Sequence, residues 1–384
     1  MIKKFTLKNY KNFGKEISLD FSKVAGYKFN SDCITNGIIG KSIIYGRNAT
    51  GKTNLGKAIG DIVDTVIGGR LYNFQNDKIV NADSEETFVS FKYEFQFDDS
   101  NIVYIYDRNL KDKLSYEKLL INDDVIYEIC FEKGAFSVNN LELIEAQTIQ
   151  IDKYISTINT SSEIEIGEDE REQVPFLRYI LSNGVLAPNS VLFKMEEYIK
   201  RMRFYSVNLQ IQNKIGTSFS DYLGENGNLK HFEEFLNIMG IECKLLALKS
   251  AEGHFELFFE HKSPISFYSS ASSGTLSLTN LYMRYIAGIK TPSFIYLDEF
   301  DAFYHYEMAE KLVKYFKLKY PETQVVLTTH NTNLMCNQLM RPDCLFILSR
   351  DGRITALCDA TERELREGHN LEKLYIGGEF EQYE

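Results

Sequence analysis

The stretch from Gly46 to Thr53 carries the pattern most suited to chemistry in this sequence: a glycine, four variable residues and then Gly-Lys-Thr. Gly46 and Gly51 allow the backbone to turn tightly, so that successive N–H groups point inward at phosphate oxygens. Lys52 would reach the β- and γ-phosphates, and the Thr53 hydroxyl is a ligand for magnesium. The spacing therefore predicts a loop that binds the phosphates of a nucleoside triphosphate.

The segments on either side of this loop match what such a loop requires. Ser42–Tyr45 is a short apolar run with β-branched residues, which predicts a buried strand. Beyond the loop, Leu55, Ile59 and Ile62 recur at helical spacing, and the start of this helix adds the positive end of its dipole. We expect the nucleotide to be bound by Gly46, Arg47, Asn48, Ala49, Thr50, Gly51, Lys52, Thr53 and Asn54.

Two acidic residues follow a second apolar run, Phe294–Leu297, which we predict to be a buried strand. Carboxylates at the C-terminal end of such a strand lie where α/β sheets bind ligands. We predict that Asp298 holds Mg²⁺ through water, and that Glu299 orients and deprotonates the attacking water. Two acids at a strand end are common in isolation, but the complete phosphate loop upstream favours the functional interpretation.

Two further patterns are weaker when taken alone. The apolar run Gln324–Thr329 ends at His330, which is placed to hydrogen-bond a γ-phosphate, although a lone histidine is usually structural. Ser269–Leu276 is rich in small hydroxyl residues and precedes a predicted helix, Ser277–Ile289. Backbone amides and hydroxyls at a helix N-terminus form an anion site, and a plain helix cap explains them equally well.

The composition sets the broad class of the protein. With 384 residues, 44% of them hydrophobic, the chain can bury a large core and form two lobes. Its six cysteines include no C-x-x-C pair, which favours reduced thiols in a cytosolic protein over a disulfide framework or a zinc site. No signal-like N-terminus is present and no apolar run approaches the roughly 18 residues that span a bilayer, so we expect a cytoplasmic protein without membrane contact. The net charge of −11 argues against a globally basic nucleic-acid surface and leaves a local basic groove open.

The hydrophobic patterns divide the chain into three parts. We predict an opening antiparallel β unit that combines Lys3–Asn9 and Lys15–Phe21 with the core strand Ser42–Tyr45, followed by a strand pair, Thr87–Phe97 and Ile102–Asn109. The pattern changes from about residue 110, and strands alternate with helices again from residue 254. The sequence predicts a discontinuous α/β domain, 1–109 and 254–384, with an inserted lobe at 110–253.

The predicted insert contains two helical patterns, Val191–Arg203 and His231–Gly240. Basic and aromatic residues interleave at Tyr198–Tyr205, a combination that can hold phosphates and stack bases. A helix end with its basic face in water explains the same residues and is the favoured interpretation.

Taken together, the motifs resemble those of ABC-type P-loop ATPases, including SMC and RecF-like heads. Gly46–Thr53 resembles Walker A, and Phe294–Glu299 resembles Walker B. Asp301–His305 occupies the D-loop position and His330 that of the switch histidine. Gln96 is a candidate for the Q-loop glutamine. The residues that lie where this class has its signature sequence are Ser272, Ser273 and Gly274.

The resemblance covers about residues 1–105 and 255–384 and implies a P-loop ATPase head with a mixed central sheet. It implies ATP and Mg²⁺ as cofactors and ATP hydrolysis as the activity, with Lys52, Glu299 and His330 as catalytic residues and Thr53 and Asp298 as metal ligands. It further implies a homo-oligomer, at least a head-to-head dimer, in which the signature residues of one subunit cap the γ-phosphate held by the other.

Within this class, the loop sequence, Thr328–Asn331 and His369–Tyr375 look most like stand-alone "AAA-type" ATPases of prokaryotic anti-phage defence, RloA-like, AriA-like or OLD-like. Only 331–384 follow the switch histidine, too short for a TOPRIM nuclease domain, so we expect a separately encoded effector protein. The expected function is that of a sensor and scaffold that controls this effector. An SMC/RecF-like DNA-repair ATPase is the alternative, with nucleic acid as its partner. The ATPase of a membrane transporter fits less well because the insert is long for that role.

Overall fold

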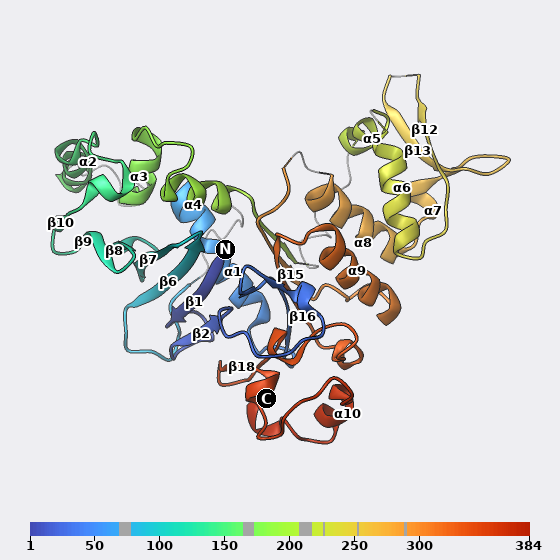
Figure 1. The fold of residues 1–384 in the computed structure, drawn as a ribbon. Helices are drawn as coiled ribbons and strands as arrows, with labels where there is room; N and C mark the ends of the chain where they lie inside the picture. Colours follow the sequence, from blue (N-terminus) through green and yellow to red (C-terminus); the bar gives the residue numbers. More distant parts are fainter. Residues whose placement is uncertain (69–77, 164–172, 207–216, 226, 252, 288–289) are drawn as a thin grey trace.

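Figure 1 shows the computed structural model, which describes residues 1–68, 78–163, 173–206, 217–225, 227–251, 253–287 and 290–384. At its centre is a six-stranded sheet in the order β11-β15-β16-β5-β17-β18, in which only β18 runs antiparallel to its neighbour. Its strands are β5 (Lys41–Tyr45), β11 (Met202–Ser206), β15 (Phe294–Asp298), β16 (Gln324–Thr329), β17 (Leu345–Leu348) and β18 (Ile354–Ala356). Every residue of β5, β15, β16 and β17 is buried, which explains why these strands read as continuous apolar runs.

A second, seven-stranded antiparallel sheet has the order β10-β9-β8-β7-β6-β1-β2. Its strands are β1 (Ile2–Lys8), β2 (Ile17–Asp20), β6 (Phe88–Phe97), β7 (Ser100–Asn109), β8 (Leu114–Ile121), β9 (Asp124–Cys130) and β10 (Ala135–Val138). Buried and partly exposed residues alternate along β6, as expected when one face of an antiparallel sheet covers a core. The predicted pairing of Thr87–Phe97 with Ile102–Asn109 is confirmed.

One part of the predicted opening unit is wrong. The strands predicted at Lys3–Asn9 and Lys15–Phe21 do pair, as β1 and β2. Ser42–Tyr45, however, lies in the six-stranded sheet, where β5 runs parallel to β16 and β17. The physical reason is burial on both faces, which a parallel sheet covered by helices provides.

Helices cover the two sheets and form two projecting regions (Figure 1). The phosphate loop leads into α1, which contacts β11 and β15 and continues as a π-helical turn, Val63–Ile67. A three-stranded sheet, β12 (Leu245–Lys249), β13 (Phe255–Phe259) and β14 (Ile265–Ser266), packs with α5, α6 and α7 at the upper right of Figure 1. The helices are α1 (Lys52–Ile62), α2 (Ile151–Glu163), α3 (Phe176–Asn183), α4 (Val191–Lys200), α5 (Thr217–Leu223), α6 (Asn228–Ile238), α7 (Phe267–Ser270), α8 (Ser273–Leu281), α9 (Tyr306–Lys319) and α10 (Leu371–Ile376). A two-stranded ribbon, β3 (Ile34–Thr35) and β4 (Ile38–Ile39), completes the strands of the described residues.

The stretch 110–253, predicted to be an inserted lobe, contributes to both large sheets. Strands β8, β9 and β10 extend the seven-stranded sheet, and β11 forms the edge of the six-stranded sheet beside β15. Among the described residues of this stretch, α2 to α4 lie outside both sheets on one side, and α5, α6 and β12 lie outside them on the other. A boundary at residue 253 therefore divides the lobe that contains β12 and β13.

The helix predicted at Val191–Arg203 is too long. It ends at Lys200, and Met202–Ser206 forms β11. Tyr198 and Tyr205 are 4% and 5% exposed, so these aromatic rings of the basic and aromatic patch belong to the core and are closed to base stacking.

Candidate nucleotide-binding site

The phosphate loop lies between the C-terminal end of β5 and the N-terminus of α1, in the predicted arrangement. Gly51 has a φ of +105°, and a Cβ there would lie 2.3 Å from the amide nitrogen of Asn12. A Cβ on Gly46 would lie 2.8 Å from the carbonyl oxygen of Leu348. Glycine is therefore required at both positions, at Gly51 by backbone conformation and at both by close packing. Arg47, Asn48 and Ala49 are exposed at the tip of the loop.

Lys52 is folded back onto the loop that precedes it. Its ammonium nitrogen donates to the carbonyl oxygens of Gly46 and Arg47 at 2.8 and 3.0 Å, and lies 3.2 Å from Nδ1 of His330. Burial lowers the pKa of Lys52, and the nearby carboxylates of Glu299 and Asp298 oppose this effect. The two carbonyl oxygens and the negative charges of the two carboxylates together stabilise the Lys52 ammonium group at the mouth of the loop.

Asp298 is the centre of a hydroxyl cluster. Its Oδ2 accepts hydrogen bonds from Thr53 Oγ1 at 2.6 Å and from Ser206 Oγ at 3.2 Å. Its Oδ1 accepts from Thr328 Oγ1 at 2.8 Å. The side chains come from α1 and from the ends of β11, β15 and β16, so four elements converge on one carboxylate that is 3% exposed.

Glu299 and His330 form the second half of the cluster. Glu299 has a φ of +48°, and its backbone N–H donates to Thr328 Oγ1 at 2.8 Å, which fixes this strained residue. Its Oε1 lies 3.1 Å from Nε2 of His330, while Nδ1 of His330 is 3.1 Å from the Gly46 carbonyl oxygen. With its proton on Nε2, His330 donates a hydrogen bond to the Glu299 carboxylate, and Nδ1 is left to accept a hydrogen bond from Lys52.

The oxygen donors beside the loop fit a magnesium ion. Mg²⁺ prefers hard oxygen ligands and is usually held by one or two protein groups together with phosphate oxygens. A hydroxyl on Thr53 and a carboxylate on Asp298, 2.6 Å apart, are donors of that type. Among the described residues no group of three or more His, Cys, Asp and Glu side chains is arranged to hold a metal ion, so a fully protein-ligated site is not formed there.

The signature residues lie elsewhere. Ser272 caps α8 by accepting from the Thr275 N–H at 3.1 Å, and Ser272 and Ser273 are exposed. A Cβ on Gly274 would lie 3.0 Å from the carbonyl oxygen of Phe303, which places this segment beside Asp301–His305. Within the described ranges, no hydrogen bond or ion pair connects Ser272, Ser273 or Gly274 with the phosphate loop of the same chain.

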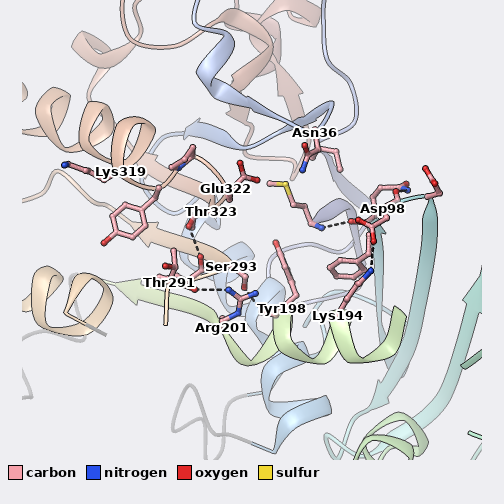
Figure 2. Close-up of a pocket in the computed structure, with 18 residues that line it drawn as sticks. Asn36, Asp98, Lys194, Tyr198, Arg201, Thr291, Ser293, Lys319, Glu322 and Thr323 are labelled. Carbon is pink, nitrogen blue, oxygen red and sulfur yellow. Dashed lines mark hydrogen bonds and ion pairs between the residues drawn. The ribbon is translucent and has the colours of Figure 1, made fainter. Parts of the chain in front are cut away.

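The Q-loop candidate Gln96 is not part of this cluster. It lines a cavity of about 740 Å³ at the other end of the central sheet, where Ser293 and Thr323 precede β15 and β16 (Figure 2). Its amide donates to the Asp98 carbonyl oxygen at 2.7 Å. Figure 2 shows the ion pair of Lys194 with Asp98 at the same cavity, where acidic and basic side chains occur together.

The sequence patterns gave no site role to four residues near the loop: Ser206, Thr328, Asn12 and Glu384. Ser206 and Thr328 bind Asp298, as described above. Asn12 donates to the Thr50 carbonyl oxygen at 3.0 Å and accepts from Asn54 at 2.7 Å. The Arg47 guanidinium forms an ion pair with Glu384. A short apolar run that ends in a serine was the one available signal for Ser206, and nothing local marks Asn12 or Glu384.

Comparisons with solved structures find similar chains at low identity. An SMC head bound to the C-winged helix domain of ScpA is 15% identical, with 93% of this chain and 97% of that chain covered and a TM-score of 0.49. An SMC head domain from Thermotoga maritima is 16% identical, with 92% and 98% covered and a TM-score of 0.45. An SMC head with an extended coiled coil, bound to the C-terminal domain of ScpA and derived from Pyrococcus furiosus, is 14% identical, with 93% and 96% covered and a TM-score of 0.45. No curated protein matches the chain.

One protein family matches most of the chain, over residues 41–336, and its description reads "AAA domain, putative AbiEii toxin, Type IV TA system". This range includes the phosphate loop, Asp298, Glu299 and His330. The predicted fold class, an α/β P-loop ATPase head with a mixed central sheet and an N-terminal antiparallel unit, is confirmed. No helix in the described parts of the chain is long and apolar enough to cross a membrane. Because the family match extends over residues 41–336, the chain belongs to this AAA-domain family of P-loop ATPases.

Proposed function

We propose that the chain binds and hydrolyses ATP, with Mg²⁺, at the cluster formed by Lys52, Thr53, Asp298, Glu299 and His330. The observation that carries this proposal is their convergence at the C-terminal ends of three neighbouring parallel strands, β5, β15 and β16. This edge is where ligands bind in α/β sheets.

The phosphate-binding groups are the loop amides, Lys52 and the start of α1. The Lys52 ammonium, now held by two carbonyl oxygens, would exchange these for β- and γ-phosphate oxygens. Thr53 and Asp298 would hold Mg²⁺, with the Ser206 hydroxyl beside them. The ion supplies charge neutralisation on the β- and γ-phosphate oxygens.

Glu299 is the proposed general base. Its backbone is fixed by Thr328, and its carboxylate is within reach of His330 at 3.1 Å. A carboxylate held in this way can orient a water and accept its proton as the water attacks the γ-phosphate. His330, at the end of β16, would hydrogen-bond the γ-phosphate and report its presence.

We also propose that Ser272, Ser273 and Gly274 act on the nucleotide of a second copy. They make no bond to the loop of their own chain within the described residues, and they are presented at the N-terminus of α8 beside the D-loop segment. Backbone amides and hydroxyls in such a position suit an anion. The active unit would then be a homodimer with ATP at its interface.

The test is ATP turnover of the full chain and two variants. Lys52→Ala should lose nucleotide binding, because the β- and γ-phosphate oxygens would then lose the ammonium group that donates to them and balances their charge. Asp298→Asn should keep nucleotide binding but lose most Mg²⁺-dependent turnover. Glu322→Gln, an acid beside the cavity of Figure 2, is the matched control and should keep the parental rate. Parental turnover in Lys52→Ala would refute the assignment.

For the biological role, we infer a sensor and scaffold of an anti-phage defence system that controls a separate effector protein in the cytoplasm. The family description, which refers to an AbiEii toxin and a type IV TA system, supports a role in this area. Native mass spectrometry of the protein purified with its neighbouring gene product, with and without ATP, tests this inference. A defined oligomer that carries the second protein supports it. Assembly with DNA alone, weakening as salt rises, would favour the DNA-repair alternative.

A further inference from the structure

A segment far from the phosphate loop in sequence, residues 371–384, reaches back to it. Nε and Nη2 of Arg47 donate to Oε2 of Glu384 at 3.0 and 2.6 Å. The arginine side chain is 58% exposed, whereas the Glu384 side chain is only 14% exposed. Tyr375, on α10, also hydrogen-bonds the Glu384 carboxylate, and burial together with this contact raises the pKa of Tyr375 to about 12. The carboxylate is therefore held between the loop and α10.

Two contacts fix the segment that carries Glu384 to the rest of the protein. The Arg353 guanidinium lies over the Tyr383 ring at 6.0 Å, and Glu379 accepts a hydrogen bond from Thr361. Within the segment, Phe380 is fully buried and its ring lies 6.4 Å from that of Tyr375. The backbone just before Glu384 is therefore held in place, and less conformational entropy is lost when its carboxylate meets Arg47.

The same segment contacts the chain beyond the switch histidine. Oγ1 of Thr332, two residues after His330, donates to Glu372 Oε1 at 3.4 Å, and α10 packs against the turn Thr332–Leu334. Helix α10 is capped by Asn370, whose side chain accepts from the Lys373 N–H. One small unit therefore touches both the tip of the phosphate loop and the element that follows His330.

Carboxylates and phosphates compete for a guanidinium, because both form charge-assisted bonds to its planar N–H groups. Arg47 projects from the loop whose amides would face the triphosphate, and Glu384 adds a negative charge at that place. On the basis of the proposed ATP site, we propose that Glu384 holds Arg47 away from the nucleotide phosphates. Binding of MgATP must then break this ion pair, so the Glu384 contact weakens nucleotide binding.

The experiment measures the Kd of the full chain for a non-hydrolysable ATP analogue with Mg²⁺, by isothermal titration calorimetry. Glu384→Gln keeps the shape of the side chain and removes its charge. Exposed ion pairs contribute little, so we expect the Kd to fall by only about two- to fivefold. Glu381→Gln is the matched control, because it removes the same charge from the same short turn without a hydrogen bond to Arg47. Its Kd should change less.

A double variant separates the ion pair from general repulsion. In the Arg47→Ala background, Glu384→Gln should no longer change the Kd. An unchanged Kd in the single variant Glu384→Gln, or the same gain with and without Arg47, would overturn the proposal. If the parental chain itself fails to bind the analogue, or if Lys52→Ala binds it equally well, the proposed ATP site is wrong. That result is distinct from a failure of the Glu384 proposal.

Discussion

Replacement of Thr328 by valine should lower both stability and turnover, although Thr328 itself does not belong to any predicted set of site residues. Thr328 is fully buried in β16. Its hydroxyl donates to Asp298 Oδ1 at 2.8 Å and accepts from the Glu299 N–H at 2.8 Å. Valine has almost the same shape, so the substitution removes two hydrogen bonds and leaves a buried carboxylate oxygen and a backbone N–H without that partner.

The expected magnitude follows from these two bonds. A hydrogen bond to a charged group contributes about 1.5–3 kcal/mol and a neutral one about 0.5–1.5 kcal/mol, so the free energy of unfolding should fall by about 2–4 kcal/mol. Without the hydroxyl, the backbone of Glu299 at φ +48° loses its anchor. Misplacement of the proposed general base should lower kcat about ten- to hundredfold, while KM changes little because Thr328 makes no bond to the phosphate loop.

Urea unfolding and steady-state ATP turnover measure the two effects. Thr328→Ser is the control, because it keeps the hydroxyl and loses only a methyl group, at about 1 kcal/mol. Serine should retain most of kcat. If Thr328→Val and Thr328→Ser have equal kcat values, the hydroxyl does not position Glu299 and the reasoning fails.

Three other predictions concern the framework of the site. Gly56→Ala should destabilise the protein by about 1–3 kcal/mol in thermal unfolding, despite the higher helix propensity of alanine, because its Cβ would lie 2.4 Å from the Tyr296 ring; a raised Tm would contradict this. Burial lowers the pKa of Lys41 from 10.5 to about 8, so the unfolded chain binds more protons between these values. The free energy of unfolding in urea should therefore rise by about 3 kcal/mol more for the parental protein than for Lys41→Met as the pH increases from 8 to 10.5. If the unfolding free energies of the two proteins change with pH in parallel, this prediction is wrong. Glu117 is fully buried and accepts hydrogen bonds from two tyrosine hydroxyls and from the N–H groups of Phe176 and Leu177. Glu117→Gln places an amide NH₂ group where one of these donors needs an acceptor, so the free energy of unfolding in urea should fall by about 1–3 kcal/mol, and unchanged stability would refute the role of these bonds.

The residues that sequence patterns placed correctly are those set by local structure. The phosphate loop sits between its strand and its helix, and Asp298, Glu299 and His330 follow strands that are buried on both faces. Such strands stand out as apolar runs, and parallel strands bring their C-terminal ends to one edge. Local patterns therefore sufficed to predict that these side chains lie together.

The remaining features depend on contacts between distant parts of the chain. Strand β11 follows α4 after a single residue, and the apolar Met202 continues the helical spacing, so the predicted helix Val191–Arg203 wrongly includes the first two residues of the strand. Ser206 meets Asp298 across 92 positions, and Arg47 meets Glu384 across 337. Only tertiary packing brings these pairs together, and no local pattern records it.

The assignment of Glu299 is the central claim, and Glu299→Gln tests it most directly. Native mass spectrometry of the full chain with MgATP should show a long-lived dimer that retains ATP in this variant, whereas the parental protein should return to ADP-bound or free chains. Glutamine keeps the shape and the contact with His330 but cannot accept a proton. Hydrolysis at the parental rate by Glu299→Gln, with no trapped dimer, would contradict the account.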